Sequence, residues 1–398
     1  MVNTKHDTAS YENCSYQREI FDANALYDAF KHARKNSDWK SQVQKFEMTY
    51  LLSISQMQKD IQNKSYTFLP TSEFVIKERG KTRVIHGEQI QDRIVKHSLC
   101  DEHLMPLVQP YLIYDNGANQ KGKGVDFTRK RLLTHLRRYY KKHGSNNGYI
   151  LLIDFSKYFD NIQHKKLLEQ FNKYGCGEIA NWMLSEIVDR LKVDVSYMTD
   201  EEYTNCLNVL FNSLEYQNID KSLLTGEKYM NKHLDLGDQV AQIAGVMYPT
   251  PIDNYIKIVK SVKFYGRYMD DSYVIHESKE FLEELLKEIT IIANDLGIII
   301  NPKKTRICKL SDYWRFMQIQ YSLTETGRVV RKINPKRLTA MRRKMKKVIN
   351  FMSIDEFNEW YISWFNSHYK YMSRQQRKNL NDLCEELKGM KRKCIKSS

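Results

Sequence analysis

The pattern of apolar and polar residues is clearest in the middle of the chain. Residues 149–155 form a continuous apolar run that ends in an acid, as expected of a strand buried on both faces. Residues 263–268 and 272–276 predict two short strands, and residues 269–271 predict the turn that joins them. The sequence therefore predicts one buried strand and one hairpin.

Helices are predicted beside these strands. One runs from about residue 163 to 173 and is stopped by Gly175. Another begins after Ser278, which can cap it, and ends at Gly297. Its apolar positions recur with a period close to 3.6 residues, and a further strand is expected at 298–300. This order of elements predicts an α+β fold in which helices back an antiparallel sheet.

The N-terminal part of the chain has a different pattern, with helical segments on either side of a hairpin. Residues 1–65 are polar and helical in pattern, and residues 89–108 predict a long helix. Between them, residues 74–76 and 82–85 read as the strands of a hairpin. The apolar positions of the first segment include Phe46, Tyr50, Leu51 and Ile54, and the hairpin carries Lys77, Arg79, Lys81 and Arg83.

The last quarter predicts three helices. In residues 335–349, apolar side chains recur at intervals of three, four, three and one, which places them on one helical face. Two more helical stretches follow, the last near 374–388. Earlier in the chain, a helix at about 240–259 is interrupted by two prolines, and residues 190–232 show no ordering pattern. The apolar face of the first C-terminal helix comprises Leu338, Met341, Met345, Val348 and Ile349.

Charge is distributed unevenly. The chain of 398 residues has 63 Lys and Arg against 48 Asp and Glu, a net charge of +15. Residues 301–398 contain 24 basic and 8 acidic residues, so all of the excess lies in this segment. A basic block of this kind indicates either a polyanionic partner, most simply nucleic acid, or a solvated lysine-rich surface.

Composition narrows the cellular setting. No apolar run approaches the ~20 residues of a membrane span, so no membrane partner is expected. The N-terminus lacks a signal-peptide core, and the seven cysteines are scattered without paired spacing. These features predict a cytoplasmic protein with reduced thiols.

Three acids stand at the ends of predicted strands. Asp154 ends the buried run, while Asp270 and Asp271 occupy the hairpin turn. An aspartate is common in turns, but adjacent carboxylates repel each other, and a divalent cation relieves that repulsion. Oxygen ligands suit Mg²⁺ or Mn²⁺, and two such ions can catalyse phosphoryl transfer.

These motifs resemble those of reverse transcriptases. Residues 268–271 (Tyr-Met-Asp-Asp) are similar to the Y-x-D-D hairpin, and residues 154–159 are similar to the first catalytic motif. The similarity extends to the arginine- and lysine-rich segments 79–85 and 91–97 of the fingers in bacterial enzymes. Residues 116–124 and 301–305 also resemble family segments, in the family's order.

The resemblance implies a role for each matching residue. Asp154, Asp270 and Asp271 match the ligands of two Mg²⁺ ions, with help from the backbone carbonyl of Phe155. Phe159 matches the steric gate that excludes a ribose 2′-hydroxyl. Lys304 matches a general acid for pyrophosphate, with Lys303 as its rival. The residues that match the triphosphate-binding cations are Lys81 and Arg83, with Arg79 as a third candidate.

One segment departs from the commonest pattern of the family. Where group II intron and retron enzymes usually have Q-G-x-x-x-S-P, residues 237–242 resemble the G-x-x-x-S-Q form of diversity-generating retroelements and of some unclassified bacterial reverse transcriptases. The resemblance places Gln242 against the incoming nucleotide and template base. Fidelity and template choice are therefore in question, although polymerisation is still expected.

The expected architecture is a right-hand polymerase with an antiparallel-sheet palm, fingers and a helical thumb. The predicted segments are N-terminal helices and fingers at 1–148, palm at 149–325 with a fingers-like insertion at about 175–235, and basic thumb at 326–398. In the thumb, Arg342, Arg343, Lys346 and Lys347 are the candidate duplex-binding residues. No zinc-type Cys/His spacing or RNase H segment is recognised.

The expected activity is RNA-directed DNA polymerisation on an RNA template with a DNA primer or product. An RNA-dependent RNA polymerase and a catalytically silent RNA-binding protein are the alternatives. The first is disfavoured by Phe159 and the second by the presence of all three acids. The expected biological role is antiviral defence with a dedicated non-coding RNA, in a bacterial or phage-associated setting. A diversity-generating retroelement or a retron is the alternative role, and the oligomeric state is not indicated.

Overall fold

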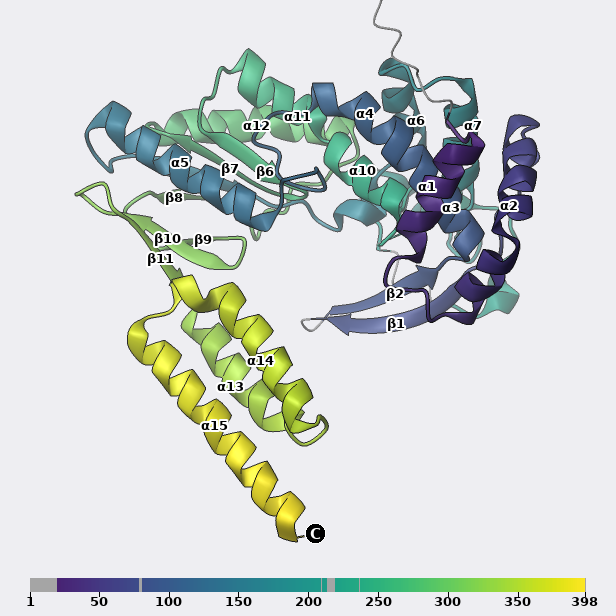
Figure 1. Cartoon of the computed structure of the whole chain (residues 1–398). Helices are drawn as coiled ribbons and strands as arrows, with labels where there is room; N and C mark the ends of the chain where they lie inside the picture. Colours follow the sequence, from purple (N-terminus) through teal and green to yellow (C-terminus); the bar gives the residue numbers. More distant parts are fainter. Residues whose placement is uncertain (1–19, 79–80, 209, 213–218, 236, 398) are drawn as a thin grey trace, which may run out of the picture. The chain divides into compact units, whose positions relative to one another are not determined.

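The structure, a computed structural model, describes residues 20–78, 81–208, 210–212, 219–235 and 237–397. The chain forms two compact units, each built from two separate segments (Figure 1). Unit 1 contains the chain up to Leu112 and residues Phe159–Tyr248, and unit 2 contains Ile113–Tyr158 and Pro249–Ser398. These units differ from the three consecutive segments expected from the sequence, because a compact body can be assembled from distant stretches of chain.

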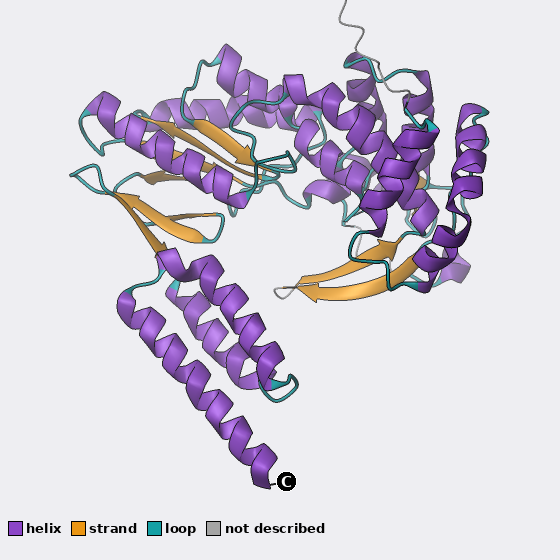
Figure 2. Cartoon of the chain, in the orientation of Figure 1, coloured by secondary structure: helices purple, strands orange, loops and turns teal. Residues whose placement is uncertain are grey.

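A four-stranded antiparallel sheet forms the centre of unit 2, and Figure 2 colours its strands orange. The strand order is β6-β7-β3-β8. The inner strand β3 is almost fully buried and pairs with β7 on one side and β8 on the other. The predicted buried strand and hairpin are both confirmed, although the first hairpin strand begins two residues later than expected. The strands are β3 (Tyr149–Ile153), β6 (Tyr265–Tyr268), β7 (Asp271–His276) and β8 (Arg306–Lys309).

The strand predicted at 298–300 is wrong. Ile300 makes only an isolated bridge with Phe155, and the fourth strand of the sheet is β8. The backbone turns immediately after this run, where the N–H of Asn301 donates to the carbonyl of Asp154 and the N–H of Thr305 donates to Asn301. The run is therefore too short for a ladder, and pairing resumes only after the turn.

Two helices of unit 2 pack along this sheet, α5 (Val125–His143) and α12 (Lys279–Asp295) (Figure 1). Helix α12 begins as predicted, because the Ser278 hydroxyl accepts a hydrogen bond from the Phe281 N–H. It ends as predicted, with Gly297 in the left-handed conformation at a φ of 73°. Its buried side chains are Leu282, Leu285, Ile289 and Ala293.

The C-terminal part of unit 2 consists of a three-stranded sheet and three helices (Figure 1). Its strands are β9 (Trp314–Phe316), β10 (Ile319–Leu323) and β11 (Val329–Ile333). Its helices are α13 (Pro335–Val348), α14 (Ile354–His368) and α15 (Arg374–Ser397). The three predicted helices are confirmed, and Leu338, Met341, Met345 and Ile349 are buried as expected. A continuous apolar core joins these helices to α5 and to the strands of the four-stranded sheet.

Unit 1 is mainly helical and contains the predicted hairpin, β1 (Ser72–Glu78) with β2 (Lys81–Gly87). The helix expected at 89–108 is present, but residues Leu99–Leu104 are π-helical. In the N-terminal helices Phe46 and Ile54 are buried, whereas Leu51 is 68% exposed, contrary to its expected place on the apolar face. The remaining helices of eight or more residues are α1 (Ala23–Arg34), α2 (Ser41–Gln62), α3 (Ile90–Ser98), α6 (His164–Lys173), α7 (Glu178–Asp189), α8 (Asp200–Asn208) and α10 (Gln239–Met247).

The structure also shows the secondary structure of the described residues in 190–232 and of residues 240–259. The region left unordered from the sequence contains a small sheet of β4 (Val193–Asp194) and β5 (Tyr229–Met230), packed around its own apolar cluster. The helix expected at 240–259 is divided at the prolines, as predicted, into α10, α11 (Thr250–Asn254) and a π-helical turn at Tyr255–Val259. Among the described residues, no helix combines the length and the apolarity required to cross a membrane.

Candidate active site

Asp154 lies directly after the buried strand β3 of unit 2, and its side chain is 14% exposed. Its backbone is tied to the segment after α12, because its carbonyl accepts from the Asn301 N–H at 2.8 Å. The Lys304 ammonium lies 2.9 Å from each oxygen of the Asp154 carboxylate. The turn at residues 301–305 thus brings a cation to the acid at the end of the sheet.

Asp270 and Asp271 lie at the tip of the β6–β7 hairpin. Tyr268 pairs with Asp271, so Met269 and Asp270 form a two-residue turn. Met269 has a φ of 53°, a left-handed conformation that costs a non-glycine residue about 1–2 kcal/mol. The hairpin turn predicted from the sequence is therefore confirmed as a tight and locally strained turn.

A buried ion pair supports this turn. Arg267 on β6 is completely buried, and its guanidinium makes a two-pronged contact with Asp253, with Nε 2.8 Å from Oδ1 and Nη2 2.7 Å from Oδ2. The remaining nitrogen, Nη1, donates to the backbone carbonyl of Met269 at 3.0 Å. The Tyr265 hydroxyl also donates to Asp253 at 2.5 Å. Arg267 therefore holds the carbonyl of the strained residue Met269 in place.

Arg267 and Asp253 were not recognised from the sequence. Burial by itself would lower the pKa of the Arg267 guanidinium, but the Asp253 carboxylate reverses this effect and raises it. Removing one partner of such a pair leaves an uncompensated buried charge, which typically costs about 3–5 kcal/mol. The available signal was a charged residue at a position of β6 that faces the interior, together with an acid beside the prolines of the interrupted helix.

The three predicted acids influence one another. Burial, followed by the carboxylates of Asp270 and Asp154, raises the pKa of Asp271 to about 7. Lys304 and Arg315, a residue of β9 not anticipated from the sequence, act in the opposite direction. The structure therefore brings the three acids and Lys304 together at one end of the sheet. The surplus of negative charge there is only partly balanced by cationic side chains.

The donor set suits a divalent cation. In the described parts of the chain, no group of three or more His, Cys, Asp or Glu side chains is close enough to hold a metal ion as it stands. The chemistry nevertheless fits, because Asp154 already contacts a cation, the Lys304 ammonium, and because neighbouring carboxylates add to burial in raising the pKa of Asp271. Asp154, Asp270 and Asp271 are therefore the residues that would hold Mg²⁺ or Mn²⁺.

Phe155 lies next to this site and is buried, with its ring centroid 5.5 Å from that of Tyr158. Two other predicted substrate-binding residues belong to unit 1. Phe159 lies half-buried in the short 3₁₀ helix Tyr158–Asn161, and its carbonyl accepts from the Leu234 N–H at 2.9 Å. Gln242 lies exposed on α10. The roles of Phe159 and Gln242 at the incoming nucleotide therefore stay predictions.

The start of helix α10 is firmly held within unit 1. The Asp238 side chain caps it by accepting from the Val240 N–H, and the buried Lys96 ammonium lies 2.6 Å from the same carboxylate. Lys96 also contacts Glu88. Gln242 thus stands one turn into a helix whose first residue is positioned by buried charges.

Lys81 and Arg83 lie on strand β2, paired with Glu78 and Ile76 of β1. Their side chains, and the whole of Arg79, lie outside the described residues, so their assignment to the triphosphate stays a prediction. Of the four candidate duplex-binding residues on α13, Arg342 is half-buried and the other three are exposed. Their role in binding nucleic acid also stays a prediction.

An antiparallel sheet with acids at the end of a central strand and in an adjoining hairpin turn is the palm architecture of a nucleic-acid polymerase. Residues 75–321 match the sequence model described as reverse transcriptase (RNA-dependent DNA polymerase). Because the match covers more than half of the chain, the protein belongs to the reverse transcriptase family. It is an RNA-directed DNA polymerase, a nucleotidyltransferase that copies an RNA template. No curated protein matches the chain.

Proposed function

We propose that the chain adds deoxynucleotides to a primer 3′-hydroxyl by two-metal catalysis at Asp154, Asp270 and Asp271. The observation that carries the proposal is the convergence of these acids at one end of the unit 2 sheet, where burial, followed by the carboxylates of Asp270 and Asp154, raises the pKa of Asp271. When bound, Mg²⁺ or Mn²⁺ supplies Lewis-acid chemistry that favours the deprotonated hydroxyl and neutralises the leaving pyrophosphate.

The protein supplies position, charge and a proton. Arg267 and Asp253 hold the backbone of the turn, which keeps Asp270 and Asp271 oriented toward the end of β3. The Phe155 carbonyl is the additional oxygen ligand in this proposal. The Lys304 ammonium lies 2.9 Å from both oxygens of Asp154, and in this proposal it is the group that donates a proton to the leaving pyrophosphate. Lys303, exposed in the same turn, is the alternative acid.

The two units correspond to the parts of a right-hand polymerase in this proposal. The four-stranded sheet of unit 2 is the palm, and helices α13, α14 and α15 are the thumb. The β1–β2 hairpin of unit 1 belongs to the fingers, where Lys81 and Arg83 bind the triphosphate. Gln242 on α10 contacts the nascent base pair and influences fidelity.

Phe159 is the steric gate in this proposal. An aromatic ring that occupies the space of a 2′-hydroxyl excludes ribonucleotides by steric clash. The test is primer extension on an RNA template, with dNTPs and rNTPs supplied separately to the wild-type enzyme and to Phe159→Val. The wild type should use dNTPs and discriminate against rNTPs, and the variant should lose that discrimination while retaining dNTP incorporation.

Two results would count against these assignments. Wild-type extension with rNTPs at the dNTP rate would favour an RNA-dependent RNA polymerase. An unchanged ratio of kcat/KM for dNTP and rNTP in Phe159→Val would make Phe159 a packing residue. Phe155→Leu is a suitable comparison, because Phe155 is a buried aromatic on the same chain segment.

The proposed biological role is antiviral defence together with a dedicated non-coding RNA, in the cytoplasm of a bacterial or phage-infected cell. The proposal is supported by the similarity of residues 237–242 to a motif of diversity-generating retroelements and of some unclassified bacterial reverse transcriptases, and by the basic C-terminal quarter. Sequencing of RNA that copurifies with the protein, together with the gene neighbourhood, tests it. A neighbouring variable-repeat gene would instead favour a diversity-generating retroelement, and a branched RNA–DNA product would favour a retron.

A further inference from the structure

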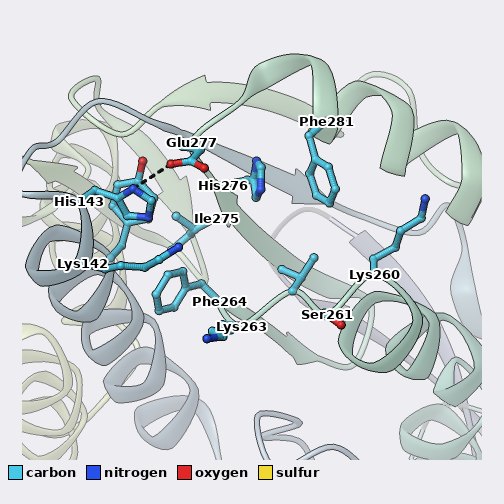
Figure 3. Close-up of a pocket in the computed structure, with 12 residues that line it drawn as sticks. Lys142, His143, Lys260, Ser261, Lys263, Phe264, Ile275, His276, Glu277 and Phe281 are labelled. Atoms are coloured by element: carbon cyan, nitrogen blue, oxygen red, sulfur yellow. Dashed lines mark ion pairs between the residues drawn. The ribbon is translucent and has the colours of Figure 1, made fainter.

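A second concave site lies in unit 2, at the end of the β6–β7 hairpin opposite to the catalytic turn. It is a cavity of about 170 Å³ between the last turn of α5, the segment 260–264, the end of β7 and the first turn of α12 (Figure 3). From His276 at this end to Asp271 at the other, β7 spans roughly 16 Å. The cavity is therefore separate from the carboxylate site and is not used by the proposed mechanism.

Positive charge predominates in the cavity wall. The wall contains Lys142, His143, Lys260 and Lys263, and one acid, Glu277. Two of these groups are paired with acids, since His143 Nδ1 lies 2.9 Å from Glu277 (Figure 3) and Lys260 Nζ lies 2.5 Å from Glu288. Among the described residues, the ammonium groups of Lys142 and Lys263 have no ion-pair partner. Two uncompensated cations therefore face a cavity whose only acid is already engaged.

Flat aromatic surfaces form the rest of the wall. The His276 ring stacks on Phe281 with centroids 4.0 Å apart, and Tyr139 stacks on His143 at 4.4 Å. Phe264 is half-buried and packs edge-on against Tyr139. Such planes bind an unstacked base, and neighbouring cations bind the phosphate attached to it.

The imidazole of His276 has a defined protonation state. Burial, with Lys142 and His143 acting in the same direction, lowers the pKa of this imidazole, which favours the neutral ring. The Ser278 N–H donates to Nδ1 at 3.1 Å, which leaves the proton on Nε2. His276 can thus donate a hydrogen bond to a base edge or a ribose without adding charge to the cavity.

The volume of the cavity limits the kind of ligand that it can bind. The cavity is smaller than the roughly 300–1,000 Å³ of typical small-molecule sites, and it is far too small for a duplex. The carboxylate of an acidic peptide would pair with the two lysines but leave the aromatic walls unfilled. A single nucleotide displaced from a folded strand satisfies both features, because it presents one phosphate and one planar base.

We propose that this cavity binds one unpaired nucleotide of a folded RNA, with its phosphate at Lys142 and Lys263 and its base against Phe264 and Phe281. The site anchors an RNA to the palm at a point distant from polymerisation. RNA is favoured over DNA because bulges and loops, which expose unstacked bases, are the usual targets of sequence-specific RNA recognition.

The experiment uses an RNA hairpin with one bulged 5-iodouridine and the full-length protein. Ultraviolet cross-linking followed by peptide mapping should place the bulged base on Phe264, His276 or Phe281. The double variant Lys142→Gln/Lys263→Gln should bind this hairpin several-fold more weakly, with a log–log salt slope smaller by about 1. The matched control is Lys141→Gln/Lys287→Gln, which removes the same charge from exposed positions of α5 and α12 that do not line the cavity.

Three outcomes would overturn the proposal: equal loss of affinity in both double variants, no cross-link within the cavity, or equal cross-linking of a fully paired hairpin. Equal binding of a DNA hairpin with the same bulge would overturn the assignment to RNA. Primer extension on a short linear template-primer should be unchanged in both double variants. Failure of the polymerase proposal is thereby distinguished from failure of this one.

Discussion

Two charge clusters lie within four residues of each other on the β6–β7 hairpin, and they are built in opposite ways. At Arg267 the charges are matched, since Asp253 contacts the guanidinium with both oxygens and both side chains are fully buried. At Asp271 the charges are mismatched, because Asp270 and Asp154 add to the effect of burial and raise its pKa to about 7. One cluster stabilises the hairpin, and the other retains a repulsion that a bound cation would relieve.

A stable ion pair beside repelling acids allows this reverse transcriptase to keep an electrostatically unfavourable site in a stable fold. The strained turn at Met269 carries the mismatched acids, and Arg267 anchors that turn through its carbonyl. Arg267 thus stabilises the same backbone segment that carries the acids proposed to react. Removing a charge from the Asp271 cluster should therefore raise the free energy of unfolding, whereas removing one from the Arg267 pair should lower it.

The largest effect on activity is expected from Asp271→Asn. If Asp271 is a metal ligand, as proposed, its loss removes several kcal/mol of transition-state stabilisation, so nucleotide addition should fall by about 10³-fold or more. Without metal, however, the variant should be more stable than the wild type at pH 8. The pKa of Asp271 is raised in the fold, so its ionised form destabilises the fold increasingly as pH rises from ~4 toward 7.

The measurement is thermal unfolding in EDTA at pH 5 and pH 8, beside primer extension with Mg²⁺. The variant should melt a few degrees above the wild type at pH 8, and this difference should be clearly smaller at pH 5. Near wild-type extension by Asp271→Asn would overturn the assignment of this acid, and a lower melting temperature at pH 8 would contradict the account of repulsion.

The opposite result is expected at the matched pair. Asp253→Asn leaves the Arg267 charge buried without its counter-ion, which should lower the free energy of unfolding by about 3–5 kcal/mol. Activity should fall as well, because Asp270 and Asp271 would lose the support of the turn. Chemical denaturation monitored by circular dichroism measures the first effect, and primer extension measures the second.

Arg267→Lys serves as the comparison for this pair. A lysine keeps the charge but lacks the planar fork that binds Asp253 and the Met269 carbonyl together. Extension should require a higher Mg²⁺ concentration, since the acids are less well oriented. Wild-type stability and Mg²⁺ dependence in both variants would show that the pair does not position the turn.

A third charge cluster, around His233 in unit 1, predicts a different dependence of stability on pH. His233 lies 3.0 Å from Asp160 and 3.1 Å from Asp235, and His86 also contacts Asp235. Although burial acts to lower it, these carboxylates raise the pKa of His233 to about 9. The contribution of His233 to stability should therefore be fully present below pH ~6.5 and be lost as pH rises through 9.

His233→Gln should remove this pH dependence, which is on the order of 2 kcal/mol between pH 6.5 and 9.5. The midpoint of urea unfolding, measured across this range, reports the effect. The Asp271 cluster loses stability at lower pH, between ~4 and 7, so the two contributions are separable. A wild-type protein whose stability is constant from pH 7 to 9.5 would contradict the account of His233.

The smallest effect on the fold is expected for exposed charges. Replacing Arg342, Arg343, Lys346 and Lys347 of α13 with Gln should weaken template-primer binding and flatten its salt dependence, by about 0.9 per lost phosphate contact on a DNA duplex. The rate of adding one nucleotide from a saturated complex should change little. Affinity measured across a salt series decides, and an unchanged slope would assign these residues to a solvated helix surface.

Several elements were predictable because their causes are local. The caps of α12 at Ser278 and Gly297, the Met269–Asp270 turn and the apolar face of α13 depend on residues close in sequence. The acids at the strand ends were found for the same reason. The expected strand at 298–300 failed because β propensity is local, whereas pairing depends on where the chain turns next.

Leu51 illustrates the same limit for helices. Its spacing in α2 fits an apolar face, yet it is 68% exposed, because burial depends on what packs against that face. Arg267 and Asp253 show the converse. Each is an ordinary charged residue in the sequence, and only the fold places both in the interior within hydrogen-bonding distance.

Residue spacing and local periodicity were enough to predict most of the elements that carry the motifs, and the resemblance of those motifs indicated the family. Tertiary structure alone decided which chain segments form each compact unit, which strand completes the sheet and which charges meet in the interior. These properties depend on contacts between residues far apart in the chain. Their energies come from desolvation and pairing, which the order of residues does not reveal.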